Sequence, residues 1–189
     1  MKNTSPILPW ALALLAACST TSDRLAELHA EDLSESTTIH DERSFASYQE
    51  HQEERRAKVR TWAEEGRLRS AEDLRRAAEI LIDSDRTGDI ELAGALAEEA
   101  ATLGEAQALP LVAEATDRLL VKRGQPQMYG TQYRYDTALG TWSLYPWDPA
   151  TTDEERQQMG VPTLVEALER ARWLNTPMDD EPLPGDAQE

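Results

Sequence analysis

The segment from Asp89 to Leu103 repeats small side chains at helical spacing. One face of such a helix would hold Ile90, Ala93, Gly94, Ala97 and Ala101. Small side chains allow two helix backbones to approach closely, so this face favours packing between neighbouring helices. Gly104 follows as the expected C-cap. We therefore expect this segment to lie in the middle of an antiparallel helical array.

Three other segments show helical periodicity around it. Residues 44–65 form a long, mostly polar pattern that stops at Gly66. Ser70 with Asp73 three residues later predicts the N-cap of a second helix. Residues 106–123 predict a fourth helix. The fold class predicted from these patterns is mainly α, with helices two, three and four as antiparallel neighbours.

The sequence changes character near residue 129, where aromatic and polar residues begin to alternate. The four residues 137–140 are a turn candidate in which Gly140 supplies positive φ. Such a turn would place Tyr135 opposite Trp142 and Tyr133 opposite Leu144. We expect a small aromatic β-hairpin, or an irregular insertion, near residues 129–147. Because a two-stranded sheet is not stable alone, its aromatic face should lie on the helices.

Two short helices are expected after the hairpin. Asp153 is the predicted N-cap of the first, and Thr163 begins the second. The second carries an apolar stripe at helical spacing, made of Leu164, Ala167, Leu168, Ala171 and Leu174.

The N-terminus has the pattern of an export signal. One Lys lies near the start, followed by an apolar run from Ile7 to Leu15 that is too short to be a stable membrane span. The tetrad from Leu15 to Cys18 resembles the lipobox of bacterial lipoproteins, which implies removal of residues 1–17 and acylation of Cys18. The alternative is a plain secretory peptide with a chance cysteine. Acylation would account for the only cysteine of an exported chain.

The residue after Cys18 and the charge of the chain indicate where it would lie. In Gram-negative lipoproteins a residue other than Asp at this place, here Ser19, implies sorting to the outer membrane. The resemblance therefore implies a lipid-anchored protein of the cell envelope that faces the periplasm, with its acyl chains in the membrane. The formal charge of −17 becomes −18 when residues 1–17, which carry only Lys2, are removed. This charge excludes nucleic acid as a partner.

Both ends of the mature chain are poor in large apolar residues. We expect residues 18–43 to be a lipidated flexible tether, with at most a transient helix from Asp23 to Leu33. Residues 175–189 contain three prolines and five acids and predict a disordered acidic tail. The helical domain would then span residues 44–174.

The loop DSDRTGDIELAG, residues 83–94, partly matches a calcium-binding EF-hand loop. Asp83 and Asp85 occupy the first and third ligand positions. The twelfth position needs a bidentate Glu but holds Gly94, so we do not expect calcium binding. The alternative is a helix-to-helix loop whose Asp residues cap the following helix.

No other constellation indicates a metal, a cofactor or nucleophilic catalysis. His29, His40 and His51 are spaced by eleven residues, but they do not share one predicted helix. The cysteine is assigned to lipidation, and no histidine lies in the second half of the domain. We expect no metal and no cofactor.

A dense polar motif spans the end of the fourth helix and the chain that follows it. It resembles a bacterial family described only as a domain of unknown function, whose hallmark is D-R-x-L, a short gap, then G-x-P-Q-x-Y-G-T-Q. The matching residues are Asp117, Arg118, Leu120, Gly124, Pro126, Gln127, Tyr129, Gly130, Thr131 and Gln132. Arg156, Gly160 and Leu164 match its closing element. The resemblance covers residues 74–174 and implies helix pairs of the tetratricopeptide or Sel1-like kind, but no activity.

This motif allows two interpretations. In the first, it is a structural clasp in which Asp117 and Arg118 satisfy the backbone of the returning loop. In the second, it forms a pocket in which Arg118 holds an anion and other side chains orient it. The remaining candidates for either role are Gln127, Tyr129, Thr131 and Gln132.

The sequence favours a non-catalytic binding or scaffold protein of the cell envelope whose partner is another envelope protein or a cell-wall component. The alternative is an enzyme that acts on a cell-wall or small anionic substrate, with Asp117 as acid or base and Arg118 as anion clamp. A weaker possibility is carbohydrate binding by the tyrosines and Trp147.

Overall fold

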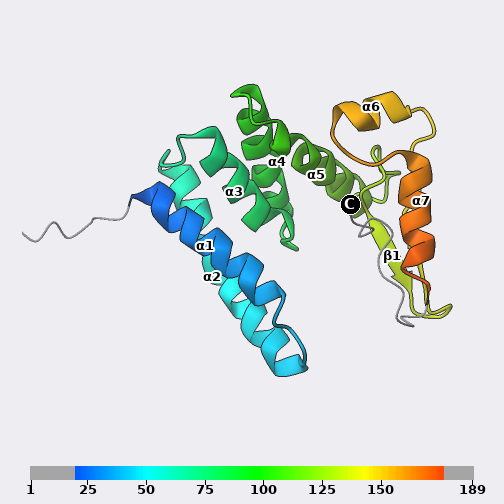
Figure 1. The fold of residues 1–189 in the computed structure, drawn as a ribbon, viewed down its shortest axis with the longest axis horizontal. Helices are drawn as coiled ribbons and strands as arrows, with labels where there is room; N and C mark the ends of the chain where they lie inside the picture. Colours follow the sequence, from blue (N-terminus) through cyan, green and yellow to red (C-terminus); the bar gives the residue numbers. More distant parts are fainter. Residues whose placement is uncertain (1–19, 177–189) are drawn as a thin grey trace, which may run out of the picture.

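The computed structural model describes residues 20–176, which are mainly helical and include a small two-stranded antiparallel sheet (Figure 1). The helices are α1 (Thr21–Ser36), α2 (Glu42–Glu64), α3 (Ala71–Ile82), α4 (Thr87–Thr102), the short 3-10 helix η1 (Ala106–Ala108), α5 (Leu109–Lys122), α6 (Asp153–Gln158) and α7 (Leu164–Trp173). The strands are β1 (Tyr133–Asp136) and β2 (Thr141–Leu144).

Helix α4 lies between α3 and α5, as its small-residue face predicts. Ile90, Ala93 and Ala97 on this face are fully buried. A Cβ atom built on Gly94 would lie 3.1 Å from the Cβ of Ala115 on α5. A larger side chain there would push the two helices apart, so the glycine allows their close approach. The expected capping pair of Ser70 and Asp73 is also confirmed at the start of α3.

The expectation of a flexible tether over residues 18–43 is wrong for its central part. Residues 21–36 form α1, which begins with a capping box between Thr20 and Asp23. Leu25 and Leu28 lie on one face of α1 and are buried in the main core. The segment has few large apolar residues, and this composition predicts a flexible chain. Two leucines at helical spacing and a set of polar contacts are nevertheless enough to dock it on the core.

These polar contacts join α1 to α3. The Ser22 hydroxyl donates to the carboxylate of Asp73 over 2.6 Å, and Nε2 of His29 lies 2.7 Å from Oε2 of Glu79. Burial disfavours ionisation of Glu79, but the neighbouring His29 and Arg75 outweigh that effect and hold the pKa of Glu79 below its usual value. The pairing partners all lie far from α1 in the sequence, so local patterns do not reveal them.

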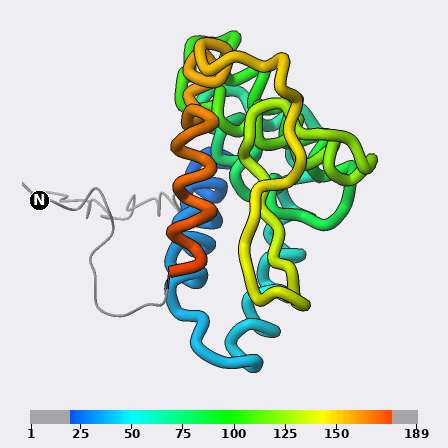
Figure 2. Tube along the Cα trace, turned by 90° about the vertical axis from the view of Figure 1, so that its right-hand side faces the viewer, coloured from blue at the N-terminus to red at the C-terminus, as the bar shows by residue number. Residues whose placement is uncertain are grey.

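The hairpin has the predicted register. Tyr133 pairs with Leu144 and Tyr135 with Trp142, and Gly140 in the turn has a φ of 65°. The expectation that the whole aromatic face lies on helices is wrong. Leu144 is buried, and the Tyr133 hydroxyl donates to the carbonyl of Ala167 on α7, which runs beside the strands in Figure 2. The rings of Tyr135 and Trp142 are exposed and contact each other with centroids 5.3 Å apart.

Two predicted caps also differ from the structure. The N-cap of α6 is Thr152, which forms a capping box with Glu155, and not Asp153. Asp153 instead accepts the backbone N–H of Leu164 at the start of α7 over 2.8 Å, which joins the last two helices. The N-cap of α4 is Arg86, and no side chain caps that helix.

The part of the chain after α5 buries few apolar residues. They are Leu144, Val161, Ala167 and Ala171, and none of them belongs to the main core cluster. A unit with so little apolar burial needs other contacts to fix its position. The predicted signal peptide at residues 1–17, the lipidation of Cys18, and the predicted tail beyond Thr176 lie outside the described residues.

The docking of α1 can be tested with two leucines of the same helix. Leu25→Ala should lower the free energy of unfolding by about 2 to 5 kcal/mol, because it opens a cavity in the main core. Leu33→Ala is the matched control, because Leu33 is 57% exposed, and it should change stability by less than about 0.5 kcal/mol. Urea denaturation of both variants gives the comparison. Equal effects would contradict a docked α1.

Candidate functional site

The motif after α5 forms where the chain reverses direction. Helix α5 ends at Lys122, and Gly124 adopts a φ of 70°, which a residue with a Cβ rarely adopts. The backbone N–H of Gln125 then donates to the carbonyl of Leu120. This turn sends residues 125–132 back past the side of α5 that carries Asp117.

The carboxylate of Asp117 lies at the centre of this returning loop and is fully buried. Its Oδ1 accepts the backbone N–H groups of Met128 at 2.7 Å and Tyr129 at 3.0 Å. Its Oδ2 accepts the backbone N–H of Thr131 at 3.0 Å and the Thr131 hydroxyl at 2.9 Å. A carboxylate bonded in this way fixes the path of the loop, because buried N–H groups need acceptors.

Arg156 holds the same loop from the other side. It lies on α6 and is 1% exposed. Its Nη2 donates to the carbonyl of Met128 and its Nε donates to the carbonyl of Tyr129, both over 3.3 Å. Asp117 thus accepts hydrogen bonds from the N–H groups of Met128 and Tyr129, and Arg156 donates hydrogen bonds to the carbonyls of the same two residues. We call Asp117, Arg156 and loop residues 128–131 the clasp.

Gln127 extends these contacts to the hairpin. Its fully buried carboxamide accepts the backbone N–H of Gln132 at 2.8 Å and donates to the carbonyls of Gln132 and Tyr145. Its backbone N–H donates to the carbonyl of Pro146, beside an isolated bridge with Trp147. One side chain therefore joins the two chain segments that enter and leave the hairpin.

Arg118 does not belong to this group. It follows Asp117 on α5 but points to the turn between α3 and α4, where its Nη1 lies 2.8 Å from Oδ1 of Asp83. The same guanidinium lies 3.5 Å from Glu114. Burial, followed by the charge of Asp83, raises the pKa of Glu114, although Arg118 acts in the opposite direction. The expected pairing of Asp117 and Arg118 in one pocket is therefore wrong.

The other motif residues have structural contacts too. The Thr131 hydroxyl binds Asp117 and accepts a bond from the amide of Gln132. The phenol of Tyr129 is partly buried, and this burial, followed by the nearby charge of Asp117, raises its pKa. Sequence reasoning placed Arg156 in the motif but not among the site residues. The signal that could have identified it was its match to the closing element of the resemblance.

The geometry of the clasp limits its chemistry. A general acid or base must reach the proton that it transfers. Asp117 is closed off from solvent, and the loop donates to both of its oxygens. Its contacts are those expected of a structural element that fixes an irregular connection.

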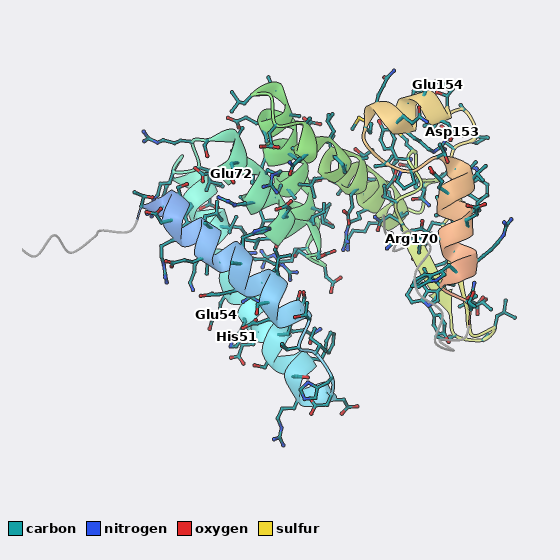
Figure 3. The ribbon with its side chains drawn as sticks, in the orientation of Figure 1. His51, Glu54, Glu72, Asp153, Glu154 and Arg170 are labelled. Atoms are coloured by element: carbon teal, nitrogen blue, oxygen red, sulfur yellow. The ribbon has the colours of Figure 1, made fainter. Side chains whose placement is uncertain are left out.

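The loop that resembles an EF-hand is occupied by internal contacts. Asp83 pairs with Arg118, and the buried Asp89 accepts bonds from Ser84 and Arg60. The histidines contact different carboxylates, His29 that of Glu79, His40 that of Asp41 and His51 that of Glu35. His51 lies on α2, far from Asp153 at the start of α6 (Figure 3). Within residues 20–176, no group of three or more His, Cys, Asp or Glu side chains could hold a metal ion.

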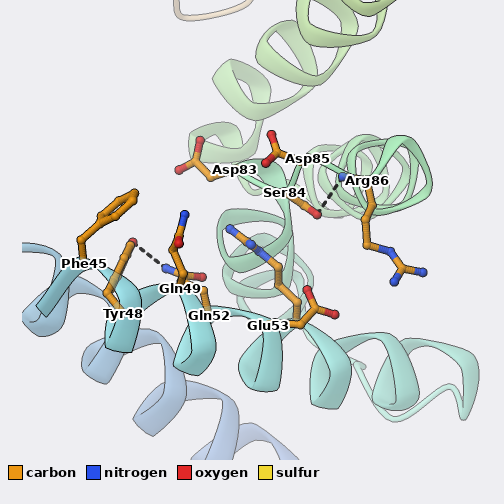
Figure 4. Close-up of a pocket in the computed structure, with 10 residues that line it drawn as sticks. Phe45, Tyr48, Gln49, Gln52, Glu53, Asp83, Ser84, Asp85 and Arg86 are labelled. Atoms are coloured by element: carbon orange, nitrogen blue, oxygen red, sulfur yellow. Dashed lines mark hydrogen bonds between the residues drawn. The ribbon is translucent and has the colours of Figure 1, made fainter. Parts of the chain in front are cut away.

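A groove that the sequence did not indicate lies between α2 and the turn that joins α3 to α4 (Figure 4). Its volume is about 410 Å³. One wall is a face of α2 that begins at Phe45, and the other wall is formed by residues 83–86. One sequence feature could have indicated this groove. The polar residues of α2 cover more of its surface than expected for a helix that packs only on the core.

The role of Asp117 can be separated from that of its neighbour. Asp117→Ala should lower the free energy of unfolding by more than about 3 kcal/mol, because several buried N–H groups lose their acceptor at about 1 to 3 kcal/mol each. Arg118→Ala removes only partly exposed ion pairs and should cost about 0 to 1 kcal/mol. Urea denaturation of the two variants is the measurement. A loss for Arg118→Ala as large as for Asp117→Ala would contradict the assignment.

The link from Gln127 to the hairpin can be tested by optical spectroscopy. Gln127→Met nearly keeps the side-chain volume but removes three hydrogen bonds to the backbone. The near-ultraviolet circular dichroism of the protein, to which the ring pair of Tyr135 and Trp142 contributes, should therefore decrease. Gln125→Met is the control, because Gln125 is exposed. An unchanged aromatic signal in the Gln127 variant would show that the hairpin does not depend on this amide.

Comparisons with known proteins give no match to a family model, to a curated protein or to a solved structure. The residues described by the structure include no helix that is long and apolar enough to cross a membrane.

Proposed function

We propose that this chain is a lipid-anchored protein of the bacterial cell envelope that binds another envelope component and catalyses no reaction. Its anchor is Cys18, which is diacylated and becomes the first residue when residues 1–17 are removed, and the protein faces the periplasm from the outer membrane. The pattern of charge, apolar run and small residues before Cys18 supports this location. The acidic charge of the chain fits attachment by acyl chains better than attachment by a basic surface.

The burial and hydrogen bonding of Asp117 are the main support for a non-catalytic function. The rival function, an enzyme acting on a cell-wall or small anionic substrate, needs this carboxylate as acid or base and Arg118 beside it. Asp117 is instead buried against the loop backbone, and Arg118 points to Asp83. The contacts of the motif therefore favour a scaffold role over an active site.

The helical part would supply the binding surface. We infer that α1 to α5 act as a short array of the tetratricopeptide or Sel1-like kind, in which stacked helices present a surface to a partner. The order of the helices supports this, because α4 packs between its sequence neighbours α3 and α5. The partner would be an envelope protein or a cell-wall component.

Carbohydrate binding is a second candidate, favoured by one observation. Tyr135 and Trp142 form an exposed aromatic pair on the hairpin. Exposed aromatic faces can stack on the apolar faces of sugars. Trp147 supports this idea less, because it lies beside Gln127 in the isolated bridge.

The anchor can be tested in cells with one substitution. Cys18→Ser should move the protein from the membrane fraction to the soluble periplasmic fraction, because the acylated side chain is lost. Globomycin, which blocks cleavage of lipoprotein signals, should also cause the uncleaved form to accumulate. Membrane partitioning of the Cys18→Ser chain equal to that of the natural chain would contradict the lipoprotein assignment.

A further inference from the structure

The groove beside α2 combines free polar groups with an exposed aromatic ring. Phe45 is 48% exposed at one end of the groove wall. Gln49 is exposed, and its carboxamide has no hydrogen-bond partner among the described residues. Figure 4 shows both side chains on α2, facing the turn that carries Asp83 and Asp85.

The side-chain amide of Gln52 also lines the groove, and its oxygen lacks a hydrogen bond within residues 20–176. Gln52 is only 4% exposed, and its Nε2 donates to Asp32 and to the Tyr48 hydroxyl. Its Oε1 is buried without a hydrogen-bond partner within residues 20–176. A buried acceptor that lacks a partner is costly, so a donor that enters the groove and shifts this side chain slightly would stabilise the complex. A carboxamide complements a peptide backbone with one donor group and one acceptor. Gln49 offers both, whereas Gln52, whose NH2 group already donates to Asp32 and Tyr48, offers its acceptor.

The charge at the mouth of the groove favours a cationic ligand. Asp85 is exposed, and its carboxylate forms no ion pair in the described part of the chain. Asp83 beside it is paired with Arg118, yet its side chain remains 71% exposed. The ring of Phe45 offers a face to the same cation. The negative charge of the whole chain attracts such a ligand from a distance.

The length of the groove matches that of a short extended peptide segment. Phe45 and Arg56 both line it and are eleven positions apart on α2. This separation corresponds to about 16 Å at the rise of an α-helix. An extended chain covers that distance with about five residues. A single small cation would leave most of this wall without contacts.

The positive charges of Arg56 and Arg86 determine in which direction the ligand lies along the groove. Arg56 donates its Nε–H to the carbonyl of Ile80 and forms no ion pair among residues 20–176. Arg86 lines the same groove and is exposed. These two cations repel a second basic side chain, so the basic residue of the ligand must lie on the Phe45 side of Asp85, where Asp83 also faces the groove (Figure 4).

We propose that this groove binds an extended segment of a partner protein, with a Lys or Arg side chain between Phe45 and Asp85. The backbone of the segment lies along Gln49 and Gln52. This assignment rests on the proposed binding function and specifies its partner as a protein with an exposed basic segment. The clasp takes no part in this contact.

The test uses the mature chain and two short fluorescent peptides. In the first peptide lysine and leucine alternate between blocked ends, and in the second glutamate replaces each lysine. Fluorescence anisotropy should show binding of the lysine peptide only. Asp85→Asn and Phe45→Ala should each weaken this binding about fivefold or more. In nuclear magnetic resonance spectra, the side-chain amide signals of Gln49 and Gln52 should shift on titration.

Glu98→Gln is the matched control. It removes the same charge as Asp85→Asn from an exposed position of α4 that does not line the groove, and it should leave the affinity unchanged. The proposal is overturned if the lysine peptide fails to bind, or if the glutamate peptide binds equally well. Equal weakening by Glu98→Gln and Asp85→Asn would also overturn it, since attraction to the net charge would then explain the binding.

Cross-linking in envelopes separates this proposal from the proposed function. A partner that cross-links to the natural chain but not to Asp85→Asn supports the groove, provided that its contact segment is basic. A partner that cross-links equally to both chains overturns the groove and leaves the scaffold function standing. Absence of any cross-linked partner for the natural chain contradicts the scaffold function itself.

Discussion

The buried carboxylate of Asp117 is the constraint on which the second half of the molecule depends. The chain after α5 has to leave a helix, reverse direction and enter a hairpin, and its own apolar core is small. Asp117 accepts the N–H groups of the reversing loop, and Arg156 donates to the carbonyls of the same residues. The loop thus lies between two buried side chains of opposite charge, and its backbone, rather than apolar contact, joins α5 to α6.

Patterns that depend on neighbouring residues were readable from the sequence. The register of the hairpin followed from its alternation and from Gly140, and the packing of α4 followed from Gly94 and its small neighbours. The capping boxes at Thr20 and Thr152 have equally local signatures and could have been identified. Contacts between distant segments were not readable. No local pattern indicates that Ser22 binds Asp73, so nothing in the sequence offsets the low apolar content of α1, which predicts a tether.

The candidate site was only partly predictable for a similar reason. The composition of the motif located the loop, but successive residues on a helix point about 100° apart. Asp117 and Arg118 therefore face different neighbours, and only the fold shows which neighbours these are. Helix α1 packs on both α2 and α3, so an element expected to be a tether contacts the helix that forms one wall of the groove.

Hydrogen exchange measures the central contact directly. The account predicts that the backbone N–H groups of Met128, Tyr129 and Thr131 are strongly protected and exchange only when the clasp opens, although they lie in an irregular loop. In Asp117→Asn the same three amides should lose much of this protection, while amides inside α4 keep theirs. Exchange of these three amides in the natural chain at the rate of an unfolded peptide would contradict the account.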